Sequence, residues 1–188
     1  MSLILPLTTT FGELIQNYSI MKNTIFRYGA YGSISITFLF FVALFLGEYL
    51  DYGAREVVGY ATMIISLSCI FFGIKHYRDH ENQGAITFIK ALTVGVFISL
   101  FVALIFGMLN VIYITYINPE FVADYYADTA VKLKNTVPAV ELQEKLKALE
   151  AEKELFSSTF MNFLLMSIML FVLGFIISLI SALFLQRK

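Results

Sequence analysis

The chain has 188 residues, of which 59% are hydrophobic and 14% charged, whereas an average soluble domain has about 25% charged residues. This composition excludes an ordinary soluble globular protein and predicts a membrane protein. Its 13 basic and 14 acidic residues balance to a net charge of −1, which excludes the strong positive field of a nucleic-acid-binding protein, and its single cysteine excludes a disulfide framework within one chain.

Residues 1–27 are predicted to form a cytoplasmic N-terminal segment, for which two interpretations stand side by side. In the first, Thr10 and Glu13 have the spacing of a capping box and begin a short interfacial helix whose apolar face is formed by Phe11, Leu14, Ile15 and Tyr18. In the second, translation starts at Met21, and the basic residues that follow it lead directly into the first membrane span.

Four stretches without charged residues are each long enough to cross a membrane as a helix, which takes about 20 residues. Their apolar residues face every direction, which is typical of membrane helices. The predicted fold class is all-α: a polytopic membrane protein with four transmembrane helices and an extramembrane helical hairpin between the third and the fourth. The predicted spans cover residues 28–47, 57–74 and 91–117 within the region 28–118, and residues 157–188 form the fourth span with a short basic tail.

Two histidines follow the second span and are four residues apart. On a helix, His76 and His80 would share a face and resemble half of a zinc site, but the sequence offers no third ligand beside them, which favours a solvated loop. Motifs that pair a nucleophile with a base are also missing from the sequence. We therefore expect no enzyme activity, no metal and no cofactor.

The third span carries a small residue at every fourth position, a pattern that lets two helix backbones approach closely. The stripe consists of Ala91, Gly95, Ser99, Ala103 and Gly107, and the fourth span echoes it with Gly174, Ser178 and Ala182. Packing within one chain is the favoured interpretation. The alternative is an interface between two copies of the chain, because a stripe of five small residues is long for packing against a single helix of the same chain.

Ionisable side chains inside a span are the usual sign of a functional site, and none of the predicted spans contains one. The most polar residue deep in a predicted span is then Asn110. A lone asparagine in a span favours a hydrogen bond between helices, and the alternative is a polar contact to a bound molecule. A second set of polar groups is predicted at the outer membrane boundary, as a belt formed by Tyr49, Tyr52, Tyr60, Tyr113 and Tyr116.

Residues 119–156 are rich in Glu, Lys and Ala and are predicted to form a helical hairpin that Pro138 divides. The second helix is expected to run unbroken into the fourth span. Apolar side chains recur at helical spacing in both helices, at Phe121, Tyr125, Tyr126, Leu142, Leu146 and Leu149. The favoured interpretation is that the two stripes bury each other, and the alternative is a docking surface for a protein partner.

Orientation follows from the basic residues of the short loops, which gather on one side of the membrane. This side has Lys22, Arg27, Lys75, Arg78, Lys90, Arg187 and Lys188. The first loop on the opposite side has Arg55 against three acidic residues. We therefore expect both termini in the cytoplasm.

Three stretches carry a resemblance to a known family: FFGIKHYRDHENQGAITFIKALTVG from Phe71 to Gly95, INPEF from Ile117 to Phe121, and the closing IISLISALFLQRK. From Met21 to the C-terminus the chain resembles an uncharacterised family of four-helix bacterial membrane proteins, found chiefly in Bacteroidetes and grouped among the domains of unknown function. The resemblance implies a multi-pass protein of the bacterial inner membrane with a periplasmic helical insert. It implies no activity.

Two functional hypotheses follow. The first is a non-enzymatic scaffold or accessory protein that binds an envelope partner through the hairpin. The alternative is a binder or carrier of a lipid-like or apolar small molecule, held in a cavity between the Phe-rich helices with Asn110 and the tyrosine belt as polar contacts.

Overall fold

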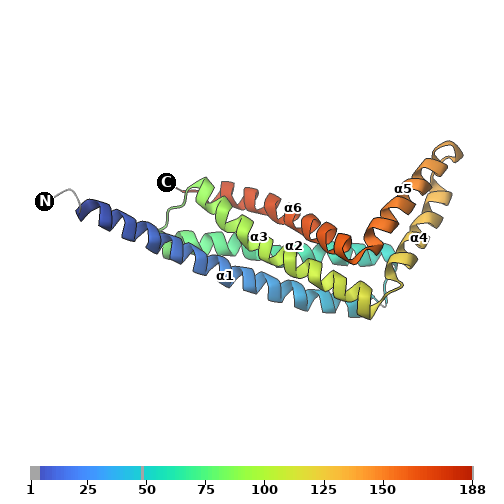
Figure 1. Ribbon diagram of the computed structural model, residues 1–188, viewed down its shortest axis with the longest axis horizontal. Helices are drawn as coiled ribbons and strands as arrows, with labels where there is room; N and C mark the ends of the chain where they lie inside the picture. Colours follow the sequence, from blue (N-terminus) through green and yellow to red (C-terminus); the bar gives the residue numbers. More distant parts are fainter. Residues whose placement is uncertain (1–4, 48, 188) are drawn as a thin grey trace.

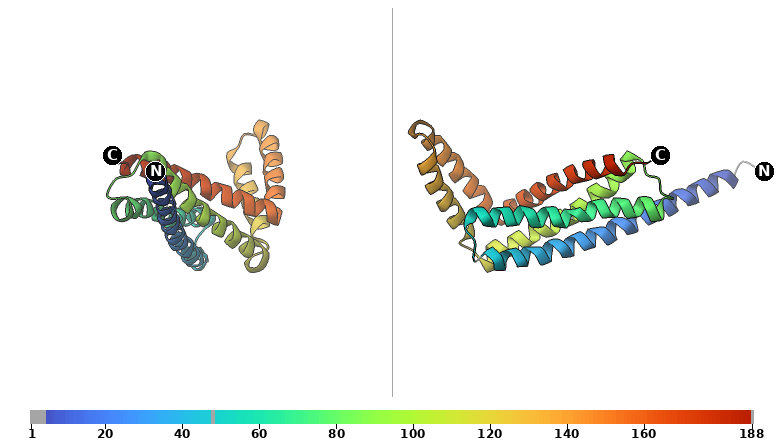
Figure 2. Two further views of the ribbon diagram at one scale, coloured as in Figure 1. Left: turned by 60° about the vertical axis from the view of Figure 1, so that its left-hand side comes forward. Right: turned by 180° about the vertical axis from the view of Figure 1, so that it is seen from behind.

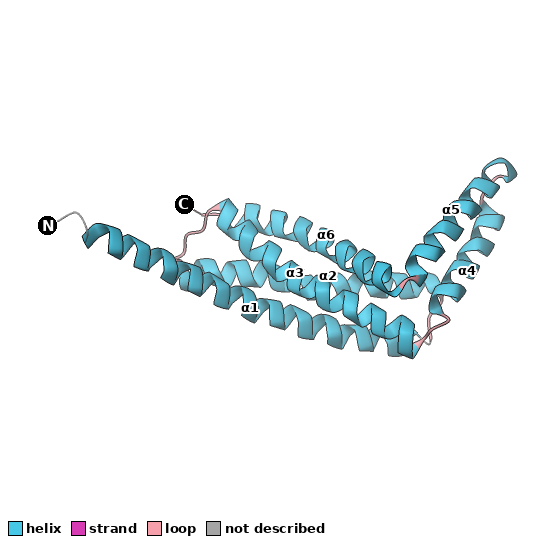
Figure 3. Ribbon diagram, in the orientation of Figure 1, coloured by secondary structure: helices cyan, strands magenta, loops and turns pink. Residues whose placement is uncertain are grey.

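The computed structural model describes residues 5–47 and 49–187, and side chains for residues 19–47, 49–51 and 53–187. In this described part every named element is a helix, joined to the next by a loop or turn, which confirms the predicted all-α fold class (Figure 3). The elements are α1 Leu5–Gly47, α2 Tyr52–His76, the π-helical turn η1 Tyr77–Glu81, α3 Phe88–Ile112, a second π-helical turn η2 Tyr113–Ile117, α4 Phe121–Thr136, α5 Ala139–Ser157 and α6 Thr159–Leu185.

Four of the described helical stretches are long and apolar enough to span a membrane, as predicted. They are Ser19–Gly47, Gly53–Glu81, Phe88–Ile117 and Thr159–Leu185. Large apolar side chains cover their outer faces; Phe45, for example, is 73% exposed and Phe184 is 79% exposed. A lipid environment accounts for these exposed side chains because the hydrocarbon core solvates apolar surface.

The first span is part of one continuous helix, since α1 runs for 43 residues from Leu5 to Gly47. From Leu5 onward, the N-terminal segment and the first span are therefore joined without a break in the helix. The side chains of Thr10 and Glu13, predicted to form a capping box, lie outside the residues whose side chains are described.

The four long helices form one bundle, and the α4–α5 hairpin projects from one of its ends (Figures 1 and 2). α1 packs against α2 and α3, and α6 packs against α3 and α2. Both chain termini lie toward the opposite end (Figure 1). We call these two ends the hairpin end and the termini end. The centre of the bundle is filled by side chains that are fully buried, among them Ile36, Leu67, Ile70, Ile98, Val102 and Leu170.

Polar residues just before two of the long helices explain where those helices begin. The Asp51 carboxylate accepts a hydrogen bond from the Ala54 backbone N–H at 2.7 Å, and the Thr87 hydroxyl accepts one from the Lys90 N–H at 3.4 Å. Both satisfy an amide that lacks a partner within its helix. At the termini end, the backbone of Ile86 pairs with that of Arg187, which ties the C-terminus to the loop between α2 and α3.

The expectation that the second hairpin helix runs unbroken into the fourth span is wrong. The helix stops at Ser158, whose backbone is extended with φ −74° and ψ 120°. Three consecutive residues with hydroxyl side chains, 157–159, lie at this break. The Ser157 hydroxyl donates a hydrogen bond to the Lys153 carbonyl at 2.8 Å. Such side chains compete with the backbone hydrogen bonds of a helix. The break lets α5 turn away to pair with α4 while α6 follows α3 (Figure 1).

Candidate functional site: a cavity at the hairpin end

The small-residue stripes of the third and fourth spans meet within one chain, along the seam between α3 and α6. A Cβ atom added at Gly95 would lie 2.7 Å from the Ser178 hydroxyl, and one added at Gly174 would lie 3.2 Å from the Ser99 hydroxyl. Nearer the hairpin, Gly107 faces Ser167 and Phe163. All eight predicted packing residues are buried, including Ala91, Ala103 and Ala182.

The predicted partner surface of the hairpin is turned mainly inward. α4 and α5 pack against each other, and the three leucines of α5 are half-buried, namely Leu142, Leu146 and Leu149. On α4, Phe121 is half-buried, Tyr126 is 6% exposed and Tyr125 is 38% exposed. These three aromatic residues line a cavity between the hairpin and the bundle.

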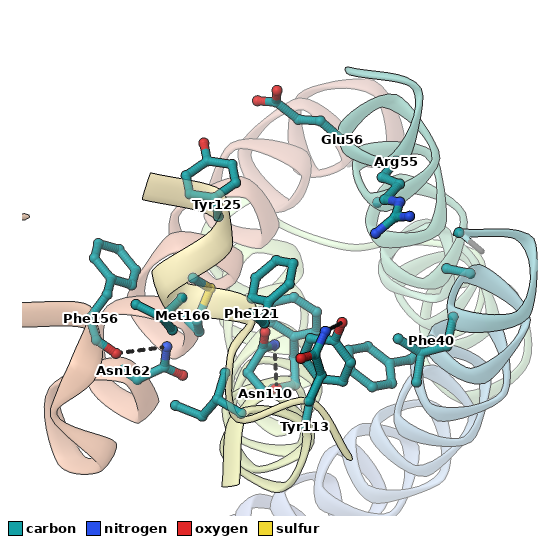
Figure 4. A pocket seen from close by; sticks show the side chains of 18 of the residues that line it. Phe40, Arg55, Glu56, Asn110, Tyr113, Phe121, Tyr125, Phe156, Asn162 and Met166 are labelled. Carbon is teal, nitrogen blue, oxygen red and sulfur yellow. Dashed lines mark hydrogen bonds between the residues drawn. The ribbon is translucent and has the colours of Figure 1, made fainter. Parts of the chain in front are cut away.

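This cavity has a volume of about 680 Å³ and lies at the hairpin end, which Figure 4 shows from close by. Seven elements border it: the end of α1, the beginning of α2, the end of α3, the turn η2, the first turns of α4, the end of α5 and the first turns of α6. We call it the hairpin-end cavity. Each element contributes a short segment, so no single stretch of sequence contains the site.

Apolar side chains form most of the cavity wall, including Phe40, Met63, Phe106, Phe156, Met166 and Met169. A chain of ring contacts crosses the wall from α1 to α4. Phe40 lies 6.0 Å from Tyr113, Tyr113 lies 5.1 Å from Phe121, and Phe121 lies 6.2 Å from Tyr125, each measured between ring centroids. Tyr113 begins the π-helical turn η2, a rare element that occurs frequently at functional sites.

Asn110, the polar residue singled out in the sequence, also lines this cavity. Its amide nitrogen donates to the Phe106 carbonyl of its own helix at 3.0 Å, and not to another helix. The tyrosines of the predicted belt lie in different surroundings. Tyr60 and Tyr113 line the cavity, whereas Tyr49 and Tyr116 are exposed, and the side chain of Tyr52 lies outside the described residues.

Asn162 was missed by the sequence analysis because it sits in the first turn of the most apolar span. The residue lines the cavity and is 2% exposed. Its amide nitrogen donates to the Phe156 carbonyl at 3.5 Å (Figure 4). The amide oxygen Oδ1 is buried and has no hydrogen-bond partner among the residues that the structure describes. The only signal in the sequence is an amide within an otherwise apolar run.

Charged and phenolic groups also line the cavity. Arg55 and Glu56 come from α2, Glu152 comes from α5, and the Arg55 Nε donates to the Leu50 carbonyl at 2.9 Å. Burial, followed by the charges of Glu56 and Glu152, raises the pKa of Tyr125. Burial and then Glu152 also raise the pKa of Tyr126. Both phenols therefore stay neutral at physiological pH.

The histidine pair lies at the termini end, away from the cavity. The His76 and His80 rings stack with centroids 4.8 Å apart, and the His76 Nε2 lies 3.5 Å from a Glu81 carboxylate oxygen. Among the residues that the structure describes, no three His, Cys, Asp or Glu side chains are grouped as metal ligands would be.

Residues 27–187 match a family described as a protein of unknown function, DUF4199. Because the match covers most of the chain, the protein belongs to this family. The expected membership of a family of unknown function is thereby confirmed for that stretch. No curated protein and no solved structure matches the chain.

Proposed function

We propose that this protein binds an amphipathic small molecule of the membrane in the hairpin-end cavity. The observation that carries the proposal is the amide oxygen of Asn162, a buried acceptor without a partner among the described residues, in a side chain that borders an otherwise largely apolar cavity. Leaving such a group unsatisfied costs about 1–3 kcal/mol, so a buried acceptor without a partner calls for a physical explanation. A bound molecule that donates a hydrogen bond would remove this cost.

The size and the lining of the cavity support the same function. A volume of about 680 Å³ falls within the range of small-molecule sites, about 300–1,000 Å³. The Phe and Met side chains suit a hydrocarbon tail, and the Asn, Tyr and Glu side chains suit a polar head group. A molecule with both parts matches a site where membrane helices meet an extramembrane hairpin.

Binding is proposed here rather than catalysis. The described cavity lining contains no histidine, cysteine or serine, and the pKa values of Tyr125 and Tyr126 are raised, which disfavours their phenolates, so we propose no activated nucleophile here. The scaffold hypothesis has less support, since the leucine stripe of α5 is half-buried in the packing of the hairpin. The cavity is therefore the feature on which the proposal rests.

A cavity-blocking variant tests the proposal. Gly59 borders the cavity, and a Cβ added there would meet nothing within 4 Å, so the side chain of Gly59→Phe is expected to extend into the cavity. Native mass spectrometry of protein released from lipid nanodiscs is expected to detect a retained amphiphile on the unmodified chain and none on Gly59→Phe. The matched control is Val57→Phe on the exposed face of α2, where Val57 is 68% exposed. Equal retention by all three proteins would refute binding in this cavity.

We also propose an orientation, with the hairpin in the periplasm and both termini in the cytoplasm of a bacterial inner membrane. The supporting observation is that Ile86, in the loop before α3, pairs with Arg187, so that Lys75, Arg78, Lys90 and Arg187 all lie toward the termini end. Lys188 lies outside the described residues.

Single-cysteine labelling checks this orientation. In a Cys69→Ser background, Lys147→Cys in the hairpin is expected to react with a membrane-impermeant maleimide added to intact spheroplasts. Gln186→Cys near the C-terminus is expected to react only after lysis. Both positions are exposed in the structure, so accessibility alone does not separate them. The reverse labelling pattern would overturn the proposed orientation.

A further inference from the structure

The α4–α5 hairpin packs on itself and projects from the end of the bundle (Figures 1 and 2). The Tyr126 ring of α4 and the Phe156 ring of α5 lie 6.3 Å apart between their centroids, and the leucine stripe of α5 is half-buried. These contacts hold α4 and α5 together. They persist when the hairpin turns relative to the bundle, so the hairpin can move as one rigid body.

Two short linkers that are not helical join the hairpin to the bundle. The first is residues 118–120, since the turn η2 ends at Ile117 and α4 begins at Phe121. Asn118 in this linker has φ −142° and ψ 80°. The second linker is Ser158, an exposed residue with an extended backbone between α5 and α6. A few residues at helix ends are what a hinge requires, because they absorb changes in φ and ψ while the helices stay intact.

The side-chain hydrogen bonds at these linkers are long. Across Ser158, the Asn162 amide nitrogen donates to the Phe156 carbonyl at 3.5 Å, which gives a partner to a carbonyl in the last turn of α5. In the first linker, the Asn118 amide nitrogen donates to the Tyr113 hydroxyl at 3.3 Å. Both exceed the usual length of about 2.9–3.0 Å, so they hold the angle between hairpin and bundle only weakly.

The hairpin-end cavity lies between the two bodies that these linkers join. The hairpin contributes one part of its wall, with Phe121, Tyr125, Tyr126, Glu152 and Phe156, and the bundle contributes the rest. Tyr125 is 38% exposed and Glu152 is exposed, so the cavity can be reached from outside the protein. Figure 4 shows the α4 side chains Phe121 and Tyr125 on the hairpin side of this space. A turn of the hairpin about its linkers therefore changes the width of the cavity.

We propose that the α4–α5 hairpin is a hinged lid, which pivots at residues 118–120 and at Ser158 and closes over an amphiphile bound in the hairpin-end cavity. This inference rests on the proposed function and specifies how the site admits and retains its ligand. Closure brings the aromatic side chains of the hairpin against the hydrocarbon part of the ligand. It removes apolar surface of both from water, which is the driving force for closing.

Distances between two spin labels test the lid. In a Cys69→Ser background, Lys147→Cys on α5 and Ile65→Cys on α2 carry nitroxide labels, and both positions are exposed. The protein is measured by pulsed electron paramagnetic resonance in lipid nanodiscs. The probe is dodecylamine, an amphiphile with a hydrocarbon tail and N–H donors. We expect the probe to shift the distance between the labels by more than about 2 Å and to narrow its distribution.

Two further label pairs are matched controls. Val131→Cys on α4 with Lys147→Cys measures a distance within the hairpin, and Ile65→Cys with Phe184→Cys on α6 measures one within the bundle. Val131 and Phe184 are both exposed. Each control distance is expected to stay unchanged, because the lid moves as one body on a fixed bundle. A shift within the hairpin as large as that between hairpin and bundle would overturn the hinge.

Retention of dodecylamine, measured by native mass spectrometry on the same samples and on Gly59→Phe, separates the two proposals. If the unmodified protein retains the probe, Gly59→Phe does not, and the distance between α5 and α2 stays unchanged, the cavity binds amphiphiles but the lid is wrong. An equal shift in Gly59→Phe would also overturn the lid, because the movement would not depend on the cavity. If retention is the same in both proteins, the proposed function itself is contradicted.

Discussion

Gly107→Leu is expected to destabilise the membrane bundle by about 3 kcal/mol, at the upper end of the usual cost of overpacking a core. The reason lies in the α3–α6 seam. A Cβ at residue 107 would overlap the Ser167 hydroxyl and would lie 2.9 Å from the Phe163 backbone oxygen. Backbone on the partner helix cannot rotate away as a side chain can, so the two helices must separate.

The measurement is unfolding of detergent-solubilised protein, followed by circular dichroism during titration with a denaturing detergent. Gly59→Ala is the control, since it also adds a Cβ to a helical glycine but meets nothing within 4 Å. Its stability is expected to change by about 0.5 kcal/mol or less. If both variants unfold at the same point as the unmodified protein, the close approach of α3 and α6 is not what stabilises the bundle.

Asn162→Leu is expected to have opposite effects on the empty and the ligand-bound protein. Without ligand, the variant removes a buried acceptor that has no described partner and gives up only a long hydrogen bond to Phe156, so stability is expected to rise by about 1 kcal/mol. With ligand, the variant lacks the acceptor to which the head group binds. The unmodified protein should gain about 2.7 kcal/mol at a ligand concentration of 100 Kd, and the variant should gain little at that concentration.

Unfolding with and without dodecylamine measures both effects. Asn135→Leu is the matched control, because it removes an exposed amide from α4 that is not part of the cavity lining. It is expected to leave the stabilisation by dodecylamine in place. If Asn162→Leu destabilises the empty protein and binds dodecylamine as tightly as before, Asn162 has a structural role only.

The features that could be read from the sequence depend on neighbours along the chain. Four spans follow from charge-free runs, and the hairpin follows from helical spacing on either side of Pro138. The small residues at every fourth position, from Ala91 to Gly107, stand out for the same reason. Helical periodicity depends on residues only three or four positions apart, so it can be recognised directly in the sequence.

Only the tertiary structure decided what lies between the helices. Phe40, Asn110, Tyr126 and Asn162 are far apart in the chain and line one cavity because the ends of α1 and α3 and the start of α6 meet under the hairpin. The break at Ser158 directs α5 away from α6 and contributes to this geometry. A cavity is the space left by the tilt and packing of several elements, and no local pattern specifies that space. The same reason explains why Asn162 gave no signal among apolar neighbours, although its oxygen, which has no partner among the described residues, carries the proposed function.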